Sequence, residues 1–210
     1  MVSCNWQTWQ LLKKRVWRSG LMANWGFNFQ KEHPGIALCG LDCYACPRYH
    51  TIGSSRCPGC DGKDFSEKHP SCGFISCAFK HGRLESCGLC PEIDTCNRIT
   101  RLKTVIKDQP GYPSYQNRIA NLIKIKGTGF EAFADTCIRK EALLKTLIDK
   151  YNDGRKKAFY CRAVQLLPLP DLENLLDENA KKGYKSVDDA ALAVSNSLKE
   201  LANKLGIEVC

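Results

Sequence analysis

The 210-residue chain lacks several features that would define its class at once. No run of about 18 consecutive apolar residues is present, which excludes a transmembrane helix. No Ser/His/Asp array, glycine-rich phosphate loop, HExxH signature or pair of catalytic carboxylates stands out, so a hydrolase or a nucleotide-dependent enzyme is not supported. No internal repeat is present. The sequence therefore leaves open whether this protein is an enzyme.

The composition is that of a folded protein with a positive charge. Apolar residues make up 43% of the chain and charged residues 25%, which excludes wholesale disorder. The net charge is +9, and residues 35–100 contribute nothing to it because their seven basic and seven acidic side chains balance. Thiolates around two divalent ions would lower the total to about +5. Lys and Arg content therefore supports a nucleic-acid partner only weakly, and we predict a protein partner.

Residues 1–34 differ from the rest of the sequence. Residues 1–21 carry three of the four tryptophans, several basic side chains and no acidic one. They do not form a secretory signal, because the charges follow the apolar residues. A basic segment for an acidic surface is one interpretation. We favour another, in which the start is mis-called and Met22 is the true first residue, because codons for Trp17 and Arg18 can form a ribosome-binding site.

The dominant feature is cysteine. Ten of the 14 cysteines fall within a single stretch of fewer than 60 residues, where glycine and proline recur and leave no room for a long helix. Such a stretch cannot bury enough apolar surface by itself and needs metals or disulfides. Thiols two or three residues apart can bind one ion together, and a second pair completes the site. The candidate metal ligands are Cys39, Cys43, Cys46, Cys57, Cys60, Cys72, Cys77, Cys87, Cys90 and Cys96.

Three kinds of site compete for these ten sulfurs. Zinc is favoured, and His50 and His81, each four residues after a cysteine, allow mixed Cys/His sites. Two 4Fe-4S clusters would use eight of the ten thiols. Disulfides suit a secreted scaffold, and the missing secretory signal argues against them. The spacing of Cys39, Cys43 and Cys46 also occurs in radical S-adenosylmethionine enzymes, but the helical sequence that follows lacks the strands of their barrel.

The ordered cysteine groups support one family resemblance. The segments Cys39-Gly-Leu-Asp-Cys43-x-x-Cys46-Pro, Cys57-Pro-Gly-Cys60, Cys72-x4-Cys77-Ala and Cys87-x-x-Cys90-Pro with Cys96 resemble the cysteine-rich domain of unknown function 3795. The resemblance covers about residues 36–103. It implies a small metal-binding domain with no assigned reaction, and it supplies no catalytic residue.

Residues 104–210 are predicted to be helical. Apolar residues recur at helical spacing, Thr128 and Glu131 suggest a capping box, Asp171 a second cap, and Ser186 with Asp189 a third. Cys137 and Cys161 lie on apolar faces and are predicted core residues. The predicted core contains Phe130, Phe133, Leu144, Leu147, Ile148, Phe159, Val164, Leu175, Leu176, Val194, Leu198 and Leu201.

The sequence thus predicts three segments. These are the basic extension 1–34, a small metal-stapled cysteine-rich module at 35–103, and an all-α helical domain at 104–210. We expect a cytoplasmic metal-binding protein whose structural zinc sites support an interaction with a protein or, less well supported, with nucleic acid. The alternative is an iron–sulfur protein that transfers electrons or supports an anaerobic enzyme.

Overall fold

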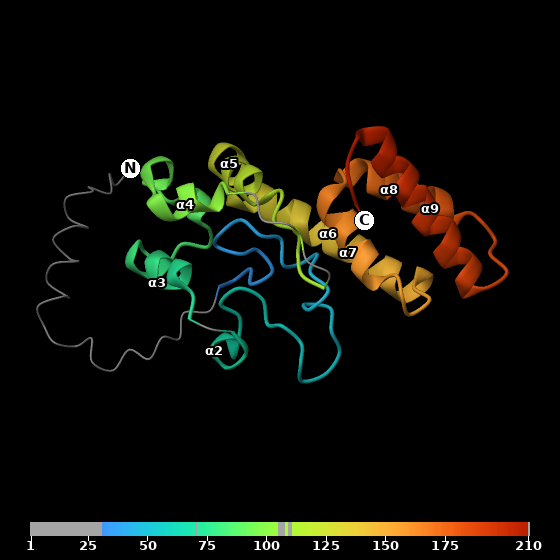
Figure 1. Cartoon of the computed structure of the whole chain (residues 1–210), viewed down its shortest axis with the longest axis horizontal. Helices are drawn as coiled ribbons and strands as arrows, with labels where there is room; N and C mark the ends of the chain where they lie inside the picture. Colours follow the sequence, from blue (N-terminus) through green and yellow to red (C-terminus); the bar gives the residue numbers. More distant parts are fainter. Residues whose placement is uncertain (1–30, 70, 105–107, 109–110, 210) are drawn as a thin grey trace, which may run out of the picture.

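The computed structural model describes residues 31–69, 71–104, 108 and 111–209. Within these ranges the chain forms eight α-helices, two 3₁₀ helices and no sheet, and one antiparallel bridge joins Ile36 to Asp42. The cysteine-rich part comes first and the long helices follow, as predicted (Figure 1).

The cysteine-rich part consists of turns and short helices. Its elements are α2 (Phe65–Lys68), α3 (Gly73–Lys80), η2 (Cys87–Leu89), η3 (Ile93–Thr95) and α4 (Asn97–Leu102). Glycine permits a close approach of the backbone at one of these turns. Gly59 has a φ of 84°, and a Cβ atom there would lie 2.4 Å from the carbonyl oxygen of Pro34. Any larger residue would push the turn at 57–60 away from the start of the module.

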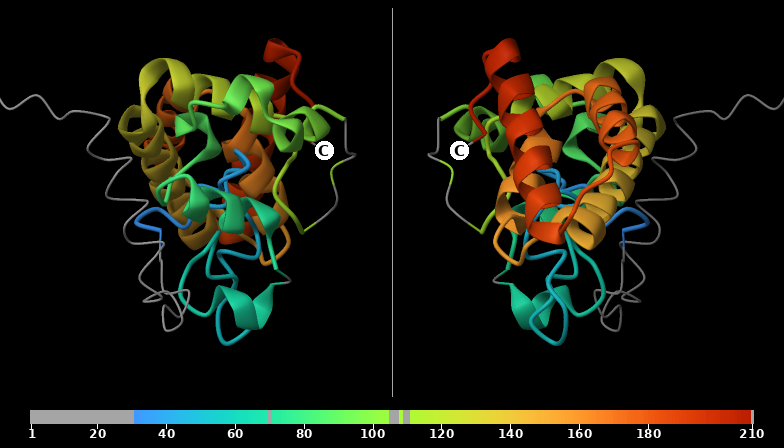
Figure 2. Two further views of the ribbon diagram at one scale, coloured as in Figure 1. Left: turned by 90° about the vertical axis from the view of Figure 1, so that its left-hand side faces the viewer. Right: turned by 90° about the vertical axis from the view of Figure 1, so that its right-hand side faces the viewer.

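The second part is a group of longer helices arranged around α6. The helices are α5 (Arg118–Thr128), α6 (Phe130–Tyr151), α7 (Lys157–Leu166), α8 (Leu169–Ala180) and α9 (Val187–Leu205). Helix α6 contacts each of the other four. Figure 2 shows these helices gathered together, with the loops of the cysteine-rich part beside them. Periodic apolar residues direct one face of each helix into a shared core.

The predicted core is confirmed. Nine of the twelve predicted residues are buried, and the other three, Ile148, Phe159 and Leu201, pack partly buried against the largest apolar cluster. Cys137 and Cys161 are buried with exposed fractions of 3% and 1%. Both thiols therefore act as small apolar side chains, as predicted.

Two of the three predicted caps are wrong. Thr128 ends α5 and its hydroxyl donates to the carbonyl of Lys124, while Gly129 precedes α6 without a side-chain cap. Asp171 lies in the first turn of α8, which begins two residues earlier. In both cases the helix starts at an apolar residue that tertiary packing buries, and packing outweighs the local hydrogen bond. Ser186 does cap α9, because its hydroxyl accepts from the N–H of Asp189 at 3.1 Å.

The two parts of the chain share apolar clusters. Ile36 and Tyr44 of the cysteine-rich part pack with Phe130 and Phe133 of α6. On the other side, Ile93 packs against Leu122 of α5. Helix α5 also contacts η2 directly. Apolar burial therefore holds the cysteine-rich part against α5 and α6.

Some predictions concern residues outside the described ranges. The interpretation of Met22 as the true start belongs to this group, as does the basic segment at residues 1–21. In the part of the chain that is described, no helix is long and apolar enough to span a bilayer.

Candidate metal centre

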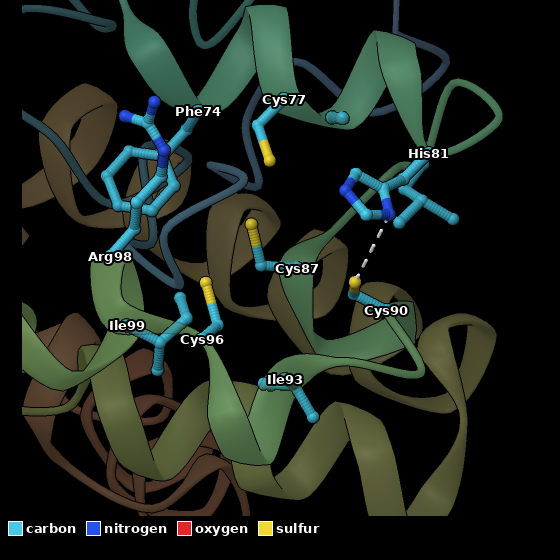
Figure 3. A pocket seen from close by; sticks show the side chains of 11 residues that line it. Phe74, Cys77, His81, Cys87, Cys90, Ile93, Cys96, Arg98 and Ile99 are labelled. Carbon is cyan, nitrogen blue, oxygen red and sulfur yellow. Dashed lines mark hydrogen bonds between the residues drawn. The ribbon is translucent and has the colours of Figure 1, made fainter.

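Four cysteines from three short elements line one small pocket. Cys77 comes from α3, Cys87 begins η2, Cys90 follows η2, and Cys96 precedes α4. Figure 3 shows the sulfurs of Cys77 and Cys87 pointing toward each other with that of Cys96 nearby, while Cys90 faces the imidazole of His81. The Nδ1 atom of His81 lies 4.0 Å from the sulfur of Cys90. Four thiols and one imidazole therefore share one pocket.

The turn at η2 follows from local hydrogen bonding. The hydroxyl of Ser86 accepts from the N–H of Gly88 at 3.1 Å, and the N–H of Cys90 donates to the carbonyl of Cys87 at 3.1 Å. A Ser side chain that bonds two residues ahead is a common way to start such a turn. The N–H of Cys87 also donates to the carbonyl of Leu38 at 3.0 Å. This turn brings both thiols of the Cys-x-x-Cys pair to the pocket.

Apolar side chains make up most of the remaining lining. Burial raises the pKa of the Cys87 thiol to about 12, and burial is also the main reason why the pKa of Cys90 is raised. Thiolates of neighbouring cysteines raise both pKa values further. Without a cation these thiols are therefore protonated at neutral pH, and a bound divalent ion would replace their protons. The apolar lining consists of Phe74, Ala78, Leu84, Ile93 and Ile99.

Backbone N–H groups point at several sulfurs with a repeated spacing. The N–H two residues further along the chain donates toward the sulfur of Cys39, of Cys46 and of Cys90. A thiol is a poor acceptor and a thiolate is a good one, so such donors favour the deprotonated form that binds metals. These turns are therefore suited to metal-bound thiolates.

The other six predicted ligands lie outside the pocket. Cys39, Cys43 and Cys60 lie close enough to one another, and Cys39 and Cys60 close enough to Cys72, for neighbouring thiolate charges to raise the pKa values of Cys39, Cys43 and Cys60. For each of the three whose pKa is raised, burial is the largest cause. The remaining two are Cys46 and Cys57. The thiolate charge of Cys57 contributes to the raised pKa of Cys46, so these two cysteines are neighbours.

The four histidines have different surroundings. His81 reaches the pocket, as the spacing after Cys77 suggested. His50 does not contact a thiol, because its Nε2 atom lies 2.5 Å from the carbonyl oxygen of Tyr44. The ring of His33 packs against that of Phe130 at a tilted angle of 57°. His69, which sequence reasoning treated as an ordinary loop residue, places its Nε2 atom 3.1 Å from the sulfur of Cys57.

The size and donor set of the pocket fit a single ion. With the side chains as they lie, its free volume is about 20 Å³, close to that of one water-sized sphere. In a tetrahedral zinc site, neighbouring sulfur and nitrogen ligands lie about 3.6 Å apart, given Zn–S of about 2.3 Å and Zn–N of about 2.0 Å. The two Cys–His separations of 4.0 and 3.1 Å bracket this value.

The thiols are not yet arranged as a closed cage. Among the described residues, no three Cys, His, Asp or Glu side chains already surround one point closely enough to hold a metal ion. A cysteine sulfur moves by about 3 Å when χ1 changes from one staggered rotamer to another. All cysteines in the described ranges are free thiols, so their side chains can make this movement.

Comparisons with known proteins add no relatives. No family model matches the chain, and no curated protein and no solved structure matches it either. The resemblance to the cysteine-rich domain of unknown function 3795 therefore stays a prediction.

Proposed function

We propose that this chain is a metal-binding protein whose cysteine-rich part holds structural zinc. The observation that carries the proposal is the pocket in which Cys77, Cys87, Cys90 and Cys96 meet beside His81. Thiolates and imidazole are the ligands that zinc prefers in structural sites. When bound, zinc would stabilise the thiolate forms of these side chains.

The role of such a site would be to join elements that share little core. Helix α3 buries only Ala78, η2 buries only Gly88, and η3 buries only Ile93. Elements with so few buried side chains gain little from the hydrophobic effect. A metal shared by α3, η2 and the start of α4 would link them directly, as in other small metal-stabilised folds.

An iron–sulfur cluster is the second candidate. Four thiols are the usual ligand set of a 4Fe-4S cluster, and the pocket supplies four. The imidazole near Cys90 favours zinc over this alternative. A cluster would point to electron transfer or to support of an anaerobic enzyme, whereas structural zinc would fix a surface for a protein partner.

Metal analysis of protein purified without oxygen tests this proposal. We expect at least one zinc per chain and no absorption near 400 nm. Cys87→Ser should lose one equivalent of zinc and unfold at a lower temperature. Cys137→Ala is the matched control, because this thiol is buried in the other apolar cluster and should leave the zinc content unchanged.

Three results would decide against zinc at this pocket. A Cys87→Ser variant with full zinc content would contradict the assignment. Iron with an equal amount of sulfide, together with a brown colour, would replace zinc by the cluster. Wild-type protein without any metal would remove both candidates.

A further inference from the structure

Residues 51–69 form a loop, here called the outer loop, whose conformation apolar burial does not explain. Its only buried residues are Gly59 and Gly62, which have no side chains. Ile52 is 96% exposed, and α2 buries no residue at all. Figures 1 and 2 show α2 and the neighbouring loop projecting away from the long helices. Something other than a hydrophobic core must hold this loop in one shape.

Hydrogen bonds of exposed groups are too weak to do so alone. Lys68 donates to the carbonyls of Ser54 and Arg56 at 2.8 and 2.9 Å, and all three residues are exposed. Such bonds exchange with water and contribute little net free energy. Hydrogen bonds also tie the loop to the rest of the module: the N–H groups of Cys57 and Cys60 donate to the carbonyls of Arg48 and Pro34. The exposed Arg56 side chain donates to the carbonyl of Tyr49 at 3.0 Å, and the hydroxyl of Thr51 donates to that of Pro47 at 3.2 Å.

Cys57 lies in the first half of the outer loop and His69 at its end, and the two side chains are in contact. The sulfur and the Nε2 atom are 3.1 Å apart, within about half an ångström of the ligand separation in a tetrahedral zinc site. The imidazole is held in this orientation by Phe65, whose ring stacks on it with centroids 4.6 Å apart and an interplanar angle of 11°. Two zinc-type donors therefore face each other from positions 12 residues apart.

Cys46 is a further thiol beside Cys57. Its sulfur accepts from the N–H groups of Arg48 and Tyr49, and its thiolate would be repelled by that of Cys57. The hydrogen bond from Cys57 to the carbonyl of Arg48 keeps the two cysteines on adjacent turns. None of Cys46, Cys57 and His69 lines the four-thiol pocket.

We propose that Cys57 and His69, with Cys46 as the third donor, bind a second zinc ion that fixes the outer loop. This inference rests on the proposed function, since it assigns a further site of the same chemistry in the same module. It gives His69 a ligating role and separates Cys46 and Cys57 from the cysteines of the pocket. The fourth position belongs to water or to a ligand from a partner.

Zinc stoichiometry of the full chain tests this site by difference. We expect His69→Gln to hold one zinc fewer than wild type, with the equivalent at the pocket retained. His50→Gln is the matched control: this histidine lies in the same module, contacts a carbonyl rather than a thiol, and should keep every zinc. The Cys87→Ser variant should lose a different equivalent, so the losses should add in the double variant.

Hydrogen exchange supplies a second readout that does not depend on a variant folding. Added Zn²⁺ should slow amide exchange of residues 51–69 in chelator-treated wild type by about tenfold or more, and the same addition should leave His69→Gln unchanged in this loop. A His69→Gln variant with the wild-type zinc content would overturn the second site, and so would a loop whose exchange ignores Zn²⁺. If Cys87→Ser loses zinc and His69→Gln does not, the pocket assignment stands and the second site is rejected. If His69→Gln loses zinc and Cys87→Ser does not, the pocket is rejected and the second site stands.

Discussion

Gly88 is the position at which the wall of the four-thiol pocket packs against the helical part. It lies within η2, between Cys87 and Cys90, and it is buried. A methyl group added there would lie 2.7 Å from the Cβ atom of Ile125 and 2.9 Å from the carbonyl oxygen of Leu122. Gly88→Ala should therefore force η2 away from α5 and displace both neighbouring thiols.

The size of the effect follows from these distances. Carbon atoms in ordinary contact lie about 3.5–4.0 Å apart, so the turn must move by roughly 1 Å or Ile125 must leave its position. Overpacking of this kind costs about 1–3 kcal/mol. For a chain of this length each kcal/mol corresponds to about 2–4 °C in Tm. Zinc affinity should fall as well, because Cys87 and Cys90 move with the turn.

Thermal unfolding, with and without added Zn²⁺, measures both effects. Gly127→Ala is the matched control, because Gly127 lies in α5 and an added Cβ has no atom within 4 Å. Alanine is the better helix former, so the control should gain about 0.5–1 kcal/mol of stability. If Gly88→Ala unfolds at or above the wild-type temperature while Gly127→Ala gains stability, the inference that η2 packs closely on α5 is wrong.

Two further predictions concern charge. Asp108 accepts from the Ser114 hydroxyl at 2.6 Å and from Arg162 at 2.8 Å. Burial raises its pKa, but these donors and the N–H of Tyr115 hold the pKa below 3.8. Asp108→Asn should therefore lower the free energy of unfolding by about 1–3 kcal/mol at pH 7. The difference should shrink as the pH falls through the folded pKa of Asp108, and a urea-unfolding difference that stays the same from pH 7 into the acid range would contradict it. A labelled oligonucleotide tests the nucleic-acid prediction. If several Lys and Arg side chains contact phosphates, raising the salt from about 50 to about 200 mM should weaken binding by about 10³-fold. Salt-independent binding, or none, would remove this prediction.

Sequence periodicity was sufficient to predict the helices of the second part and their buried faces. The faces that carry Leu144, Leu147, Val194 and Leu198 are readable from spacing alone, because an amphipathic helix repeats its buried positions every three or four residues. The cap at Ser186 could also be predicted from the sequence, because it depends only on residues that are neighbours along the chain. The cap predicted at Thr128 was not, because the burial of Phe130 rather than a nearby hydroxyl decides where α6 begins.

Cysteine spacing predicted metal chemistry and located the turns that bring neighbouring thiols together. Pairs such as Cys87 and Cys90 are close in sequence, so their turn brings them together in any fold. Spacing alone could not decide which pairs meet. That depends on how α3 and η2 pack against each other and against α5, which is a matter of contacts between distant residues.

Tertiary structure therefore decided the grouping of the donors. It brings Cys77 and Cys96 to the pair at η2, and it leaves Cys46 and Cys57 elsewhere. It also places His69 against Cys57 across 12 residues of chain that have no regular spacing to signal the contact. The sequence by itself determined that thiols are available for a metal, and the packing of short elements on α5 determined which of them lie together.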